Sequence, residues 1–249
     1  REFEQMEIEY FVREVDWEQW FEYWHKEMKR WIAELGIDAD HVREAEIPDG
    51  ERAHYSKRTI DFKYDFPFGR KELYGLAYRA DFDLKNHFKE APYRDTDPPA
   101  GGREEFWPHV IEPTWGVDRS VLAIILDSYR EEGDGDKKRV YLKLPPKLAP
   151  YQVAVFPLLA NKPQLVEKAR GVYSALLHAP CPVLHVAWDD RGNIGKRYYA
   201  QDEIGTPWCV TADFQTLEDN TVTVRDRDTA EQTRKPIAEL AAYFGERIR

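Results

Sequence analysis

The sequence predicts an α/β protein (α+β in its first part), and two patterns support this fold class. In the first part, several segments with the two-residue period of strands accompany one long amphipathic helix. In the second part, beyond the prolines at 145, 146 and 150, strands and helices alternate as they do in compact α/β domains. We therefore expect a first domain at residues 1–144, a linker at 145–150 and a second domain at 151–249.

The first domain is expected to begin with a strand. Residues 1–12 have one polar and one apolar face at period two. The polar face resembles the wall of a polar cleft and consists of Phe3, Gln5, Glu7 and Glu9. The apolar face, which we place in the core, consists of Met6, Ile8 and Tyr10. Aromatic residues at helical spacing then predict a helix from Trp17 to Leu35 that packs on a sheet and ends at Gly36.

Two more strands of the first domain are predicted at 57–65 and 71–79. Neither Asn-Gly nor Asp-Gly occurs between them, so we expect no tight two-residue hairpin. In the second domain the pattern predicts strands at 153–159, 183–188, 208–214 and 221–227, a turn at 217–220, and helices at 162–178, 194–203 and about 229–247. Asp228 is expected to cap the last of these helices.

Composition narrows the class of protein. The 249 residues include 36 Lys and Arg against 46 Asp and Glu, a net charge of −10. This balance argues against a surface that binds nucleic acid everywhere, although it allows a local basic patch. No apolar run approaches the roughly 20 residues of a membrane span. Cys181 and Cys209 have no Cys-x-x-Cys pairing, so we expect buried free thiols in a reducing cytoplasm.

The segment from 110 to 126 is the most informative in the chain. An acid between apolar residues, Glu112, precedes a Pro-x-x-Gly break and then Asp-Arg at the start of an apolar helix, expected at about 117–130. This order predicts a strand–turn–helix junction, with Glu112 at the end of a strand and Arg119 in the first helical turn. An acid and a guanidinium that face one cleft suit a zwitterion or a nucleotide phosphate.

Four segments occur together in an order and spacing typical of one enzyme family. They are Arg1-Glu-Phe-x3-Glu-Ile-Glu9, Glu72-Leu-x-Gly-x-Ala-x-Arg-x-Asp-Phe-Asp-Leu84, Pro108-His-Val-Ile-Glu-Pro-Thr-x-Gly-Val-Asp-Arg119 and residues 192–232. With them the chain resembles the dimeric glycyl-tRNA synthetases, class II aminoacyl-tRNA synthetases, from late motif 2 through motif 3 to the anticodon-binding domain. The resemblance implies part of an antiparallel class II catalytic sheet with helices, followed by a mixed-sheet α/β anticodon-binding domain.

The resemblance also implies an activity, that of a glycine–tRNA ligase. Glycine is activated with ATP to glycyl-adenylate and transferred to tRNA-Gly, while the C-terminal domain recognises the anticodon. The implied cofactors are ATP and the Mg²⁺ bound with it, and the implied partners are glycine, ATP and tRNA-Gly. A homodimer in the cytoplasm, not attached to a membrane, is expected of the full-length family member. No metal site built from protein side chains alone is expected.

The roles implied for single residues form one pocket. Glu7 and Glu112 bind the glycine ammonium, and Thr114 adds a hydroxyl. Arg79 takes the glycine carboxylate. The ATP-binding residues are Phe3 and Arg119, on opposite faces of the adenine, and Glu72, near Mg-ATP; the last two are the implied catalytic residues. The attacking carboxylate is already ionised, so the chemistry needs positioning and charge stabilisation, and the exclusion of any Cβ selects glycine.

Four basic residues of the second domain lie around the expected loops and helix starts. They are Lys196, Arg197, Arg225 and Arg227, and we expect them to contact tRNA phosphates. Nearby acids leave an alternative open, in which ion pairs form instead among Arg197, Glu203, Asp226 and Arg227.

The chain departs from the family pattern in its first residues. Motif 1 and the first strand of motif 2 are absent, and the chain begins at Arg1 inside an expected strand, so we expect further sequence upstream. Thr114 stands where the family more often has Ser. The alternatives to a ligase are a non-catalytic synthetase paralogue and a tRNA- or nucleic-acid-binding accessory module. A paralogue without catalysis has no use for an amino-acid pocket, which the chain retains in Glu7, Arg79, Glu112 and Arg119.

Overall fold

The computed structural model describes residues 3–95, 104–135, 138–179 and 185–248. The chain divides into two compact units, Arg1–Ile124 and Ile125–Arg249. This division lies before the linker predicted at 145–150, because residues 129–132 and 139–142 pair as antiparallel strands and the second of these strands packs against a helix of the second unit.

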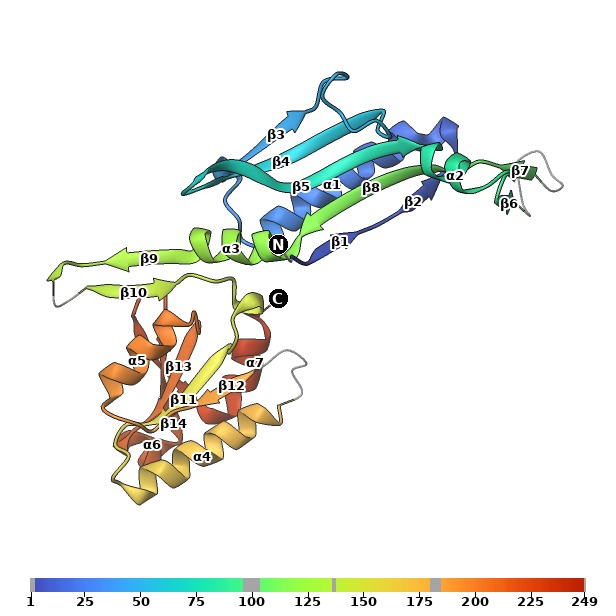
Figure 1. The fold of residues 1–249 in the computed structure, drawn as a ribbon. Helices are drawn as coiled ribbons and strands as arrows, with labels where there is room; N and C mark the ends of the chain where they lie inside the picture. The colour runs from blue at the N-terminus through green and yellow to red at the C-terminus, as the bar shows by residue number, and fades with distance from the viewer. Residues whose placement is uncertain (1–2, 96–103, 136–137, 180–184, 249) are drawn as a thin grey trace. The chain divides into compact units, whose positions relative to one another are not determined.

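The first unit is built on a six-stranded antiparallel sheet in the order β1-β8-β5-β4-β3, with β2 also paired to β8. Its strands and main helix are β1 (Gln5–Glu7), β2 (Tyr10–Val12), β3 (Val42–Glu46), β4 (Arg58–Phe66), β5 (Gly69–Ala80), β8 (His109–Gly116) and α1 (Trp17–Glu34). Helix α1 lies along one face of the sheet (Figure 1) and buries Phe21, Met28 and Ile32. The predicted helix and its packing are confirmed, and Trp17 stacks on Tyr78 of β5 with 4.1 Å between ring centroids.

Shorter elements complete the first unit. They are η1 (Glu14–Asp16), η2 (Ala39–His41), α2 (Phe82–His87), the hairpin of β6 (Tyr93–Asp95) and β7 (Glu104–Phe106), and α3 (Val117–Ser128), which continues into the second unit. The helix predicted at 117–130 is confirmed as α3, with Arg119 in its first turn.

Strand β8 does not end at Glu112, as the sequence predicts, but continues through Pro113 to Gly116. The reason lies in the neighbouring edge of the sheet. The register of β1 and β2 along β8 places Ile8 opposite Pro113, in the gap between these two short strands. Proline has no N–H to donate to a ladder. The gap therefore falls where β8 offers no donor, and the Ile8 N–H still reaches the Pro113 carbonyl at 3.1 Å.

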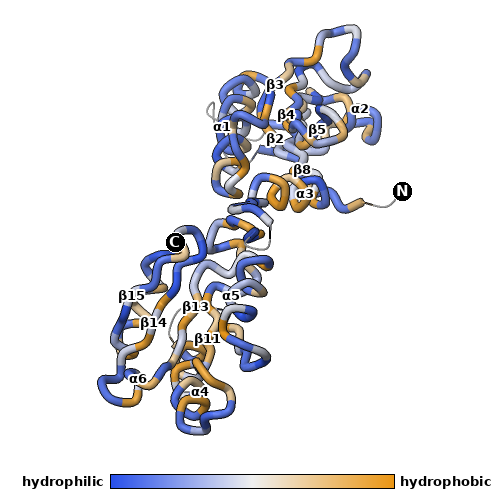
Figure 2. The backbone as a smooth tube through the Cα atoms, turned by 90° about the vertical axis from the view of Figure 1, so that its left-hand side faces the viewer, coloured by the Kyte–Doolittle hydropathy of each residue, from blue (hydrophilic) through white to orange (hydrophobic). Residues whose placement is uncertain are grey.

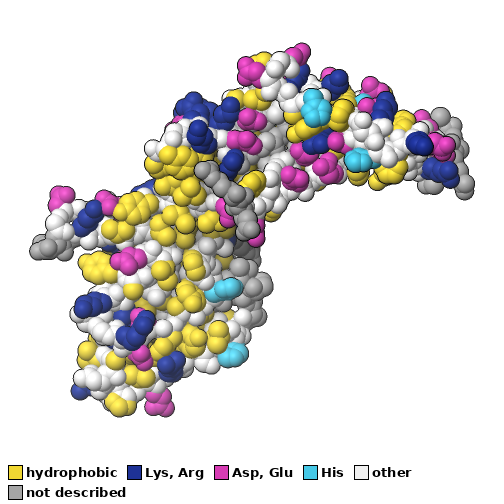
Figure 3. All heavy atoms as spheres, in the orientation of Figure 1, with side chains coloured by type: hydrophobic (Ala, Val, Ile, Leu, Met, Phe, Trp, Pro, Cys, Tyr) yellow, Lys and Arg dark blue, Asp and Glu magenta, His cyan; other side chains and the backbone are white. Residues whose placement is uncertain are grey.

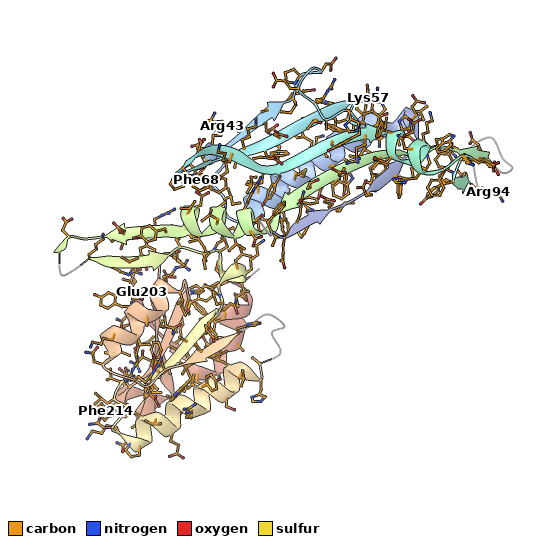
Figure 4. All side chains as sticks on the ribbon, viewed as in Figure 1. Arg43, Lys57, Phe68, Arg94, Glu203 and Phe214 are labelled. Carbon is orange, nitrogen blue, oxygen red and sulfur yellow. The ribbon has the colours of Figure 1, made fainter. Side chains whose placement is uncertain are left out.

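Two other predictions about these strands are wrong. The sequence places Met6 and Ile8 in the core, whereas they are 44% and 38% exposed at the edge of the sheet. No tight hairpin is expected between β4 and β5, yet Phe66 pairs with Gly69 across a two-residue turn. Gly69 has a φ of 103°, a conformation open to glycine, so the turn forms without Asn-Gly. Phe68 projects from this tip (Figure 4) and stacks on Phe66.

The second unit contains a mixed five-stranded sheet in the order β12-β11-β13-β14-β15, with β11 parallel to both neighbours and β14 and β15 antiparallel. Its elements are β9 (Tyr129–Glu132), β10 (Arg139–Leu142), η4 (Pro146–Leu148), β11 (Val153–Pro157), α4 (Pro163–Leu177), β12 (Val186–Trp188), α5 (Ile194–Glu203), β13 (Trp208–Ala212), α6 (Phe214–Asp219), β14 (Thr221–Asp226), β15 (Gln232–Pro236), η5 (Ile237–Glu239) and α7 (Leu240–Gly245). Hydrophobic residues run along β11 and β13 (Figure 2) and are buried in the core. The α/β fold predicted for this part is confirmed.

The last third of the second unit differs from the prediction. The turn expected at 217–220 is the end of α6, where Asn220 adopts the left-handed conformation of a C-cap with a φ of 56°. Instead of one helix at about 229–247, the chain forms β15 and then α7, because β14 has an edge with which residues 232–236 pair. Asp228 caps no helix; its N–H donates to the Asp226 carboxylate at 2.8 Å in the turn before β15.

The cysteine predictions are tested at one of the two positions. Cys209 is a buried free thiol in β13, and burial raises its pKa. Cys181 lies outside the described residues, as does the start of the strand predicted at 183–188. Over the part of the chain that the structure describes, every helix is too short or too polar to span a bilayer.

Candidate functional site

One face of the first unit's sheet is hollowed into a cavity of about 580 Å³. The alternation of β5 makes its floor, since Tyr78 packs on α1 whereas Gly75, Ala77 and Arg79 face the cavity. Small residues at 75 and 77 leave space above the sheet. The strands on either side add Thr59, Asp61, Glu112 and Thr114. The loop between β3 and β4 forms a wall that includes Tyr55.

The cavity is strongly acidic. Its lining includes the charged residues Glu7, Glu9, Glu51, Arg52, Asp61, Glu72, Arg79 and Glu112. The Arg52 guanidinium is engaged by Asp49 and by the Lys57 carbonyl, which leaves Arg79 as the main counter-charge among the lining residues that the structure describes. Figure 3 shows the first unit from the side of the sheet opposite α1, which is the side of this cavity, and acidic side chains lie there beside lysines and arginines. A recess with an excess of carboxylates attracts a cationic group.

Arg79 reaches the cavity from a β-bulge. In the register with β8, Tyr78 and Ala80 pair with consecutive residues, so Arg79 is the additional residue on β5. Ala80 has a φ of 51°, a left-handed conformation that costs a non-glycine residue about 1–2 kcal/mol. Bulges change the direction of a side chain. This one directs the Arg79 guanidinium to the carboxylate of Glu112 on β8.

The guanidinium of Arg79 has partners on three sides. Its Nη1 donates to Glu112 Oε2 at 2.5 Å. Its Nε and Nη2 donate to the two carboxylate oxygens of Asp83 in α2, at 2.7 and 2.8 Å. The ring of Tyr55 lies against its flat face, with Cζ 3.9 Å from the ring centroid. The hydrogen bonds to Asp83, and the charges of Glu112 and Asp83, hold the pKa of Arg79 above its ordinary value.

Three glutamates meet at the edge between β8 and the pair β1 and β2. The register places Glu9 opposite Glu112, and Glu7 pairs with Thr114 on the same face. Burial, together with the neighbouring charges of Glu9 and Glu7, raises the pKa of Glu112 to about 7 against the opposing effect of Arg79. Thr114 Oγ1 lies 3.5 Å from Glu112 Oε1. Carboxylates crowded in this way gain free energy when a cation binds between them.

A smaller cavity of about 200 Å³ adjoins the first and shares Gln5, Glu72 and Thr114 with it. Its walls also include Arg119 of α3 and Phe3, which is 64% exposed. Arg119 Nη1 donates to the Glu72 carbonyl at 2.7 Å. Burial and the charge of Asp61 raise the pKa of the Glu72 carboxyl. A ring and a guanidinium that border one recess provide two surfaces on which a planar base can stack.

The structure brings the predicted pocket residues together, although their roles toward a ligand remain predictions. The first cavity is lined by Glu7, Arg79 and Glu112, the second by Phe3 and Arg119, and both by Glu72 and Thr114. Three further residues lie at this site although no binding role was predicted for them from the sequence: Glu9, Tyr55 and Asp83. The alternation of residues 5, 7 and 9 signals Glu9, whereas Tyr55 and Asp83 come from a loop and a short helix whose positions depend on tertiary folding.

Three of the four basic residues predicted to contact tRNA phosphates are buried, which corrects that prediction. Arg197 is 2% exposed and donates to four backbone carbonyls. Arg225 is 6% exposed and binds both oxygens of the buried Asp202 at 2.8 and 3.0 Å. Arg227 is 2% exposed and donates to two further carbonyls. Guanidinium groups enclosed in this way hold the fold together, so Lys196, which is exposed, is the one predicted contact still available to a phosphate.

The ion pairs of this region also differ from the predicted alternative. Arg225 pairs with Asp202, and Arg227 pairs with Asp228 at 2.9 Å. Glu203 lies at the exposed end of α5 (Figure 4). The periodicity of α5 decides this difference, because it places Asp202 on the buried face of the helix and Glu203 on the exposed one.

Comparison with known proteins finds relatives of both units. Residues 152–247 match the family described as the anticodon binding domain. The whole chain is 44% identical over 253 residues to Glycine--tRNA ligase of Clostridium tetani, covering 52% of that protein. It is 44% identical to the enzyme of Geobacillus thermodenitrificans over 254 residues and 42% identical to that of Thermus thermophilus over 278, covering 52% and 54% of them. The predicted resemblance is confirmed, and the chain spans about half the length of these curated relatives.

Proposed function

We propose, from this likeness and the acidic cavity, that the chain supplies the glycine- and ATP-binding pocket and the anticodon-binding domain of a glycine–tRNA ligase. The reaction is the ATP-dependent activation of glycine to glycyl-adenylate and the transfer of the glycyl group to tRNA-Gly. The observation that carries the proposal is the cavity in which Arg79 faces the crowded carboxylates Glu7, Glu9 and Glu112. A small zwitterion complements such a cavity, because its ammonium meets acids while its carboxylate meets a guanidinium.

Glycine binds with its ammonium between Glu7 and Glu112, where like charges are crowded. Arg79 binds the glycine carboxylate. A guanidinium has five N–H donors, and Asp83 and Glu112 engage three of those of Arg79, so donors remain for the ligand. The Thr114 hydroxyl, 3.5 Å from Glu112, adds a polar group beside the ammonium.

ATP binds in the adjoining smaller cavity. Phe3 and Arg119 hold the two faces of the adenine, and Arg119 also reaches the γ-phosphate. The carboxylate of Glu72 lies where both cavities meet and is an oxygen ligand of the kind that Mg²⁺ accepts. When bound with ATP, this ion neutralises phosphate charge.

The residues act by position and charge. The ionised glycine carboxylate attacks the α-phosphate and pyrophosphate leaves, so the pocket supplies no general base for this step. Its space is confined by carboxylates and by the sheet that forms its floor. A substrate with a Cβ must displace these groups, which selects glycine by volume.

The second unit binds the anticodon region of tRNA-Gly. The exposed Lys196, in the first turn of α5, contacts a phosphate there. A homodimer in the cytoplasm is the assembly that we propose, by analogy with the family that the chain resembles. The net charge of −10 requires that contacts with tRNA be local.

Calorimetric titration of this chain with a non-hydrolysable glycyl-adenylate analogue tests the proposal, with the alanyl analogue as the control ligand. We expect the glycyl analogue to bind at least about tenfold more tightly than the alanyl one. Glu112→Gln should abolish binding. Glu105→Gln, at an exposed acid that pairs with Arg94 in the β6–β7 hairpin, should not change it. A folded chain that binds neither analogue contradicts the pocket assignment and favours an anticodon-binding accessory module.

A further inference from the structure

Two residues outside the predicted pocket enclose the guanidinium of Arg79. Asp83 binds its Nε and Nη2 edge through two hydrogen bonds of 2.7 and 2.8 Å, and Tyr55 covers its flat face at 3.9 Å. We propose that Tyr55 and Asp83 are positioning residues, which hold Arg79 against Glu112 and so set the carboxylate that receives the substrate ammonium. This inference rests on the proposed function for the identity of the substrate.

The position of Arg79 in the chain makes such a clamp necessary. Arg79 is the additional residue of a β-bulge, and the next residue, Ala80, has a φ of 51°. Arg79 therefore has no pairing partner on β8, whereas Tyr78 and Ala80 each have one. An arginine side chain also loses up to about 2 kcal/mol of rotamer entropy when it is immobilised. A bidentate carboxylate and an aromatic face provide interactions that offset this loss.

The geometry of the clamp determines which donors face the cavity. Asp83 occupies the Nε and Nη2 edge, so the planar group cannot turn without breaking both bonds. Nη1 is then directed at Glu112 Oε2, at 2.5 Å. The other oxygen, Oε1, lies 3.5 Å from Thr114 Oγ1. The Glu112 carboxyl is thereby held from one side by Arg79, and its other neighbours are the Glu9 carboxyl, with which it shares a hydrogen bond, and the Thr114 hydroxyl.

The charges around Glu112 make its ionised form depend on the position of the Arg79 guanidinium. Burial acts against its ionised form, and so do Glu9, in the gap between β1 and β2, and Glu7 of β1; Arg79 acts for it. Asp61 and Glu72 add negative charge from β4 and β5 on the same cavity. Burial and these charges raise the pKa of the carboxyl to about 7 even with Arg79 in place, so its ionised form depends on that guanidinium. An Arg79 free to swing away leaves a neutral acid that cannot accept from an ammonium as an anion.

The first experiment needs no ligand. Exchange of the Arg79 Nε proton with water, followed by NMR on the full 249-residue chain, reports whether Asp83 holds the guanidinium. We expect slow exchange in the parent chain and exchange at least about tenfold faster in Asp83→Asn, as loss of a charge-assisted hydrogen bond implies. Asp65→Asn is the matched control, because Asp65 pairs with Arg70 in the same sheet, away from the cavity. Exchange that stays slow in Asp83→Asn overturns the proposal.

The second experiment measures the consequence for binding. We expect Asp83→Asn and Tyr55→Leu to weaken the glycyl-adenylate analogue by about tenfold or more, while their affinity for AMP stays unchanged. Tyr55→Phe keeps the ring and should restore most of the affinity lost in Tyr55→Leu. Equal loss for AMP and for the glycyl analogue indicates general damage and overturns a positioning role.

The two experiments separate failure of this inference from failure of the proposed function. If the parent chain binds no glycyl analogue, the proposed function fails, and the Nε exchange alone decides whether the clamp exists. If the parent binds the analogue and Asp83→Asn binds it equally well despite fast Nε exchange, the ligand assignment stands and the positioning role is overturned.

Discussion

The two units of this chain both gather charged side chains, but they do so in opposite ways. In the second unit, the carboxylate of Asp202 is fully buried and accepts from Arg139 and Arg225 at 2.8 to 3.0 Å. In the first unit, Glu112 shares the single guanidinium of Arg79 with Asp83, faces two other glutamates, and has a pKa raised to about 7. One cluster is satisfied within the protein, and the other has an excess of one sign beside an open cavity.

This difference separates structural charges from candidate functional ones. A buried ion with complete partners holds elements together, and the loss of a partner leaves an uncompensated charge. Crowded carboxylates beside a cavity cost stability until a cation binds, which is the condition expected of a binding site. Residue type alone does not make the distinction, because both clusters consist of acids and arginines.

The largest effect is expected at the satisfied cluster. Asp202→Ala removes the shared partner of two buried arginines, Arg139 and Arg225, and should lower the free energy of unfolding by about 3–5 kcal/mol. Urea denaturation measures this change. Asp65→Ala, which breaks an exposed pair with Arg70, should lower the free energy of unfolding far less. Similar losses in the two variants would show that the buried cluster contributes no more to stability than an exposed ion pair.

Glu112→Gln tests the crowded cluster through its pH dependence. The folded-state pKa of about 7 lies above that of an unfolded glutamate, so ionising this carboxyl destabilises the folded parent as pH rises through that interval. We therefore expect the variant to match the parent below about pH 4 and to exceed it by about 2 kcal/mol near pH 8. Denaturation at three pH values measures the trend, with Glu105→Gln as the control. A stability difference independent of pH would show that Glu112 is not crowded.

The substitution Gly75→Ala tests whether the ligand occupies the space above the cavity floor. An added Cβ meets no atom nearer than Glu72 Oε1, at 3.8 Å, so the unfolding free energy should change little. The methyl group occupies space in the cavity, and we expect the glycyl-adenylate analogue to bind about tenfold more weakly. Gly171→Ala in α4, where a Cβ is also free of contacts, should leave this affinity unchanged. Unchanged binding by Gly75→Ala would place the ligand elsewhere.

The smallest effect concerns the bulge that aims Arg79. Ala80→Gly relieves a left-handed conformation, and we expect a gain of about 0.5–1 kcal/mol in the free energy of unfolding. Ala77→Gly on the same strand has no such strain to relieve and should lose about as much. Thermal denaturation of the two variants measures both values. A loss at both positions would mean that the bulge carries no strain.

Local patterns predicted much of the fold and of the candidate site. The spacing of aromatic residues predicts α1, and the predicted helix at 194–203 coincides with α5. The alternation around Glu7 and the order of Glu112 and Arg119 identify residues that the structure brings to adjoining cavities. These features are predictable because period and helix start depend on neighbours in the sequence.

The sequence by itself determined which segments are helices or strands in most of the chain, and which side chains carry the charge of the site. Tertiary structure alone decided that β8 continues through Pro113, that residues 232–236 pair with β14, and that Arg225 is buried. It also decided the contact of Arg79 with Tyr55 and Asp83. Pairing and burial depend on residues distant in the sequence, and the same arginine is a surface cation or an internal tie according to what packs around it.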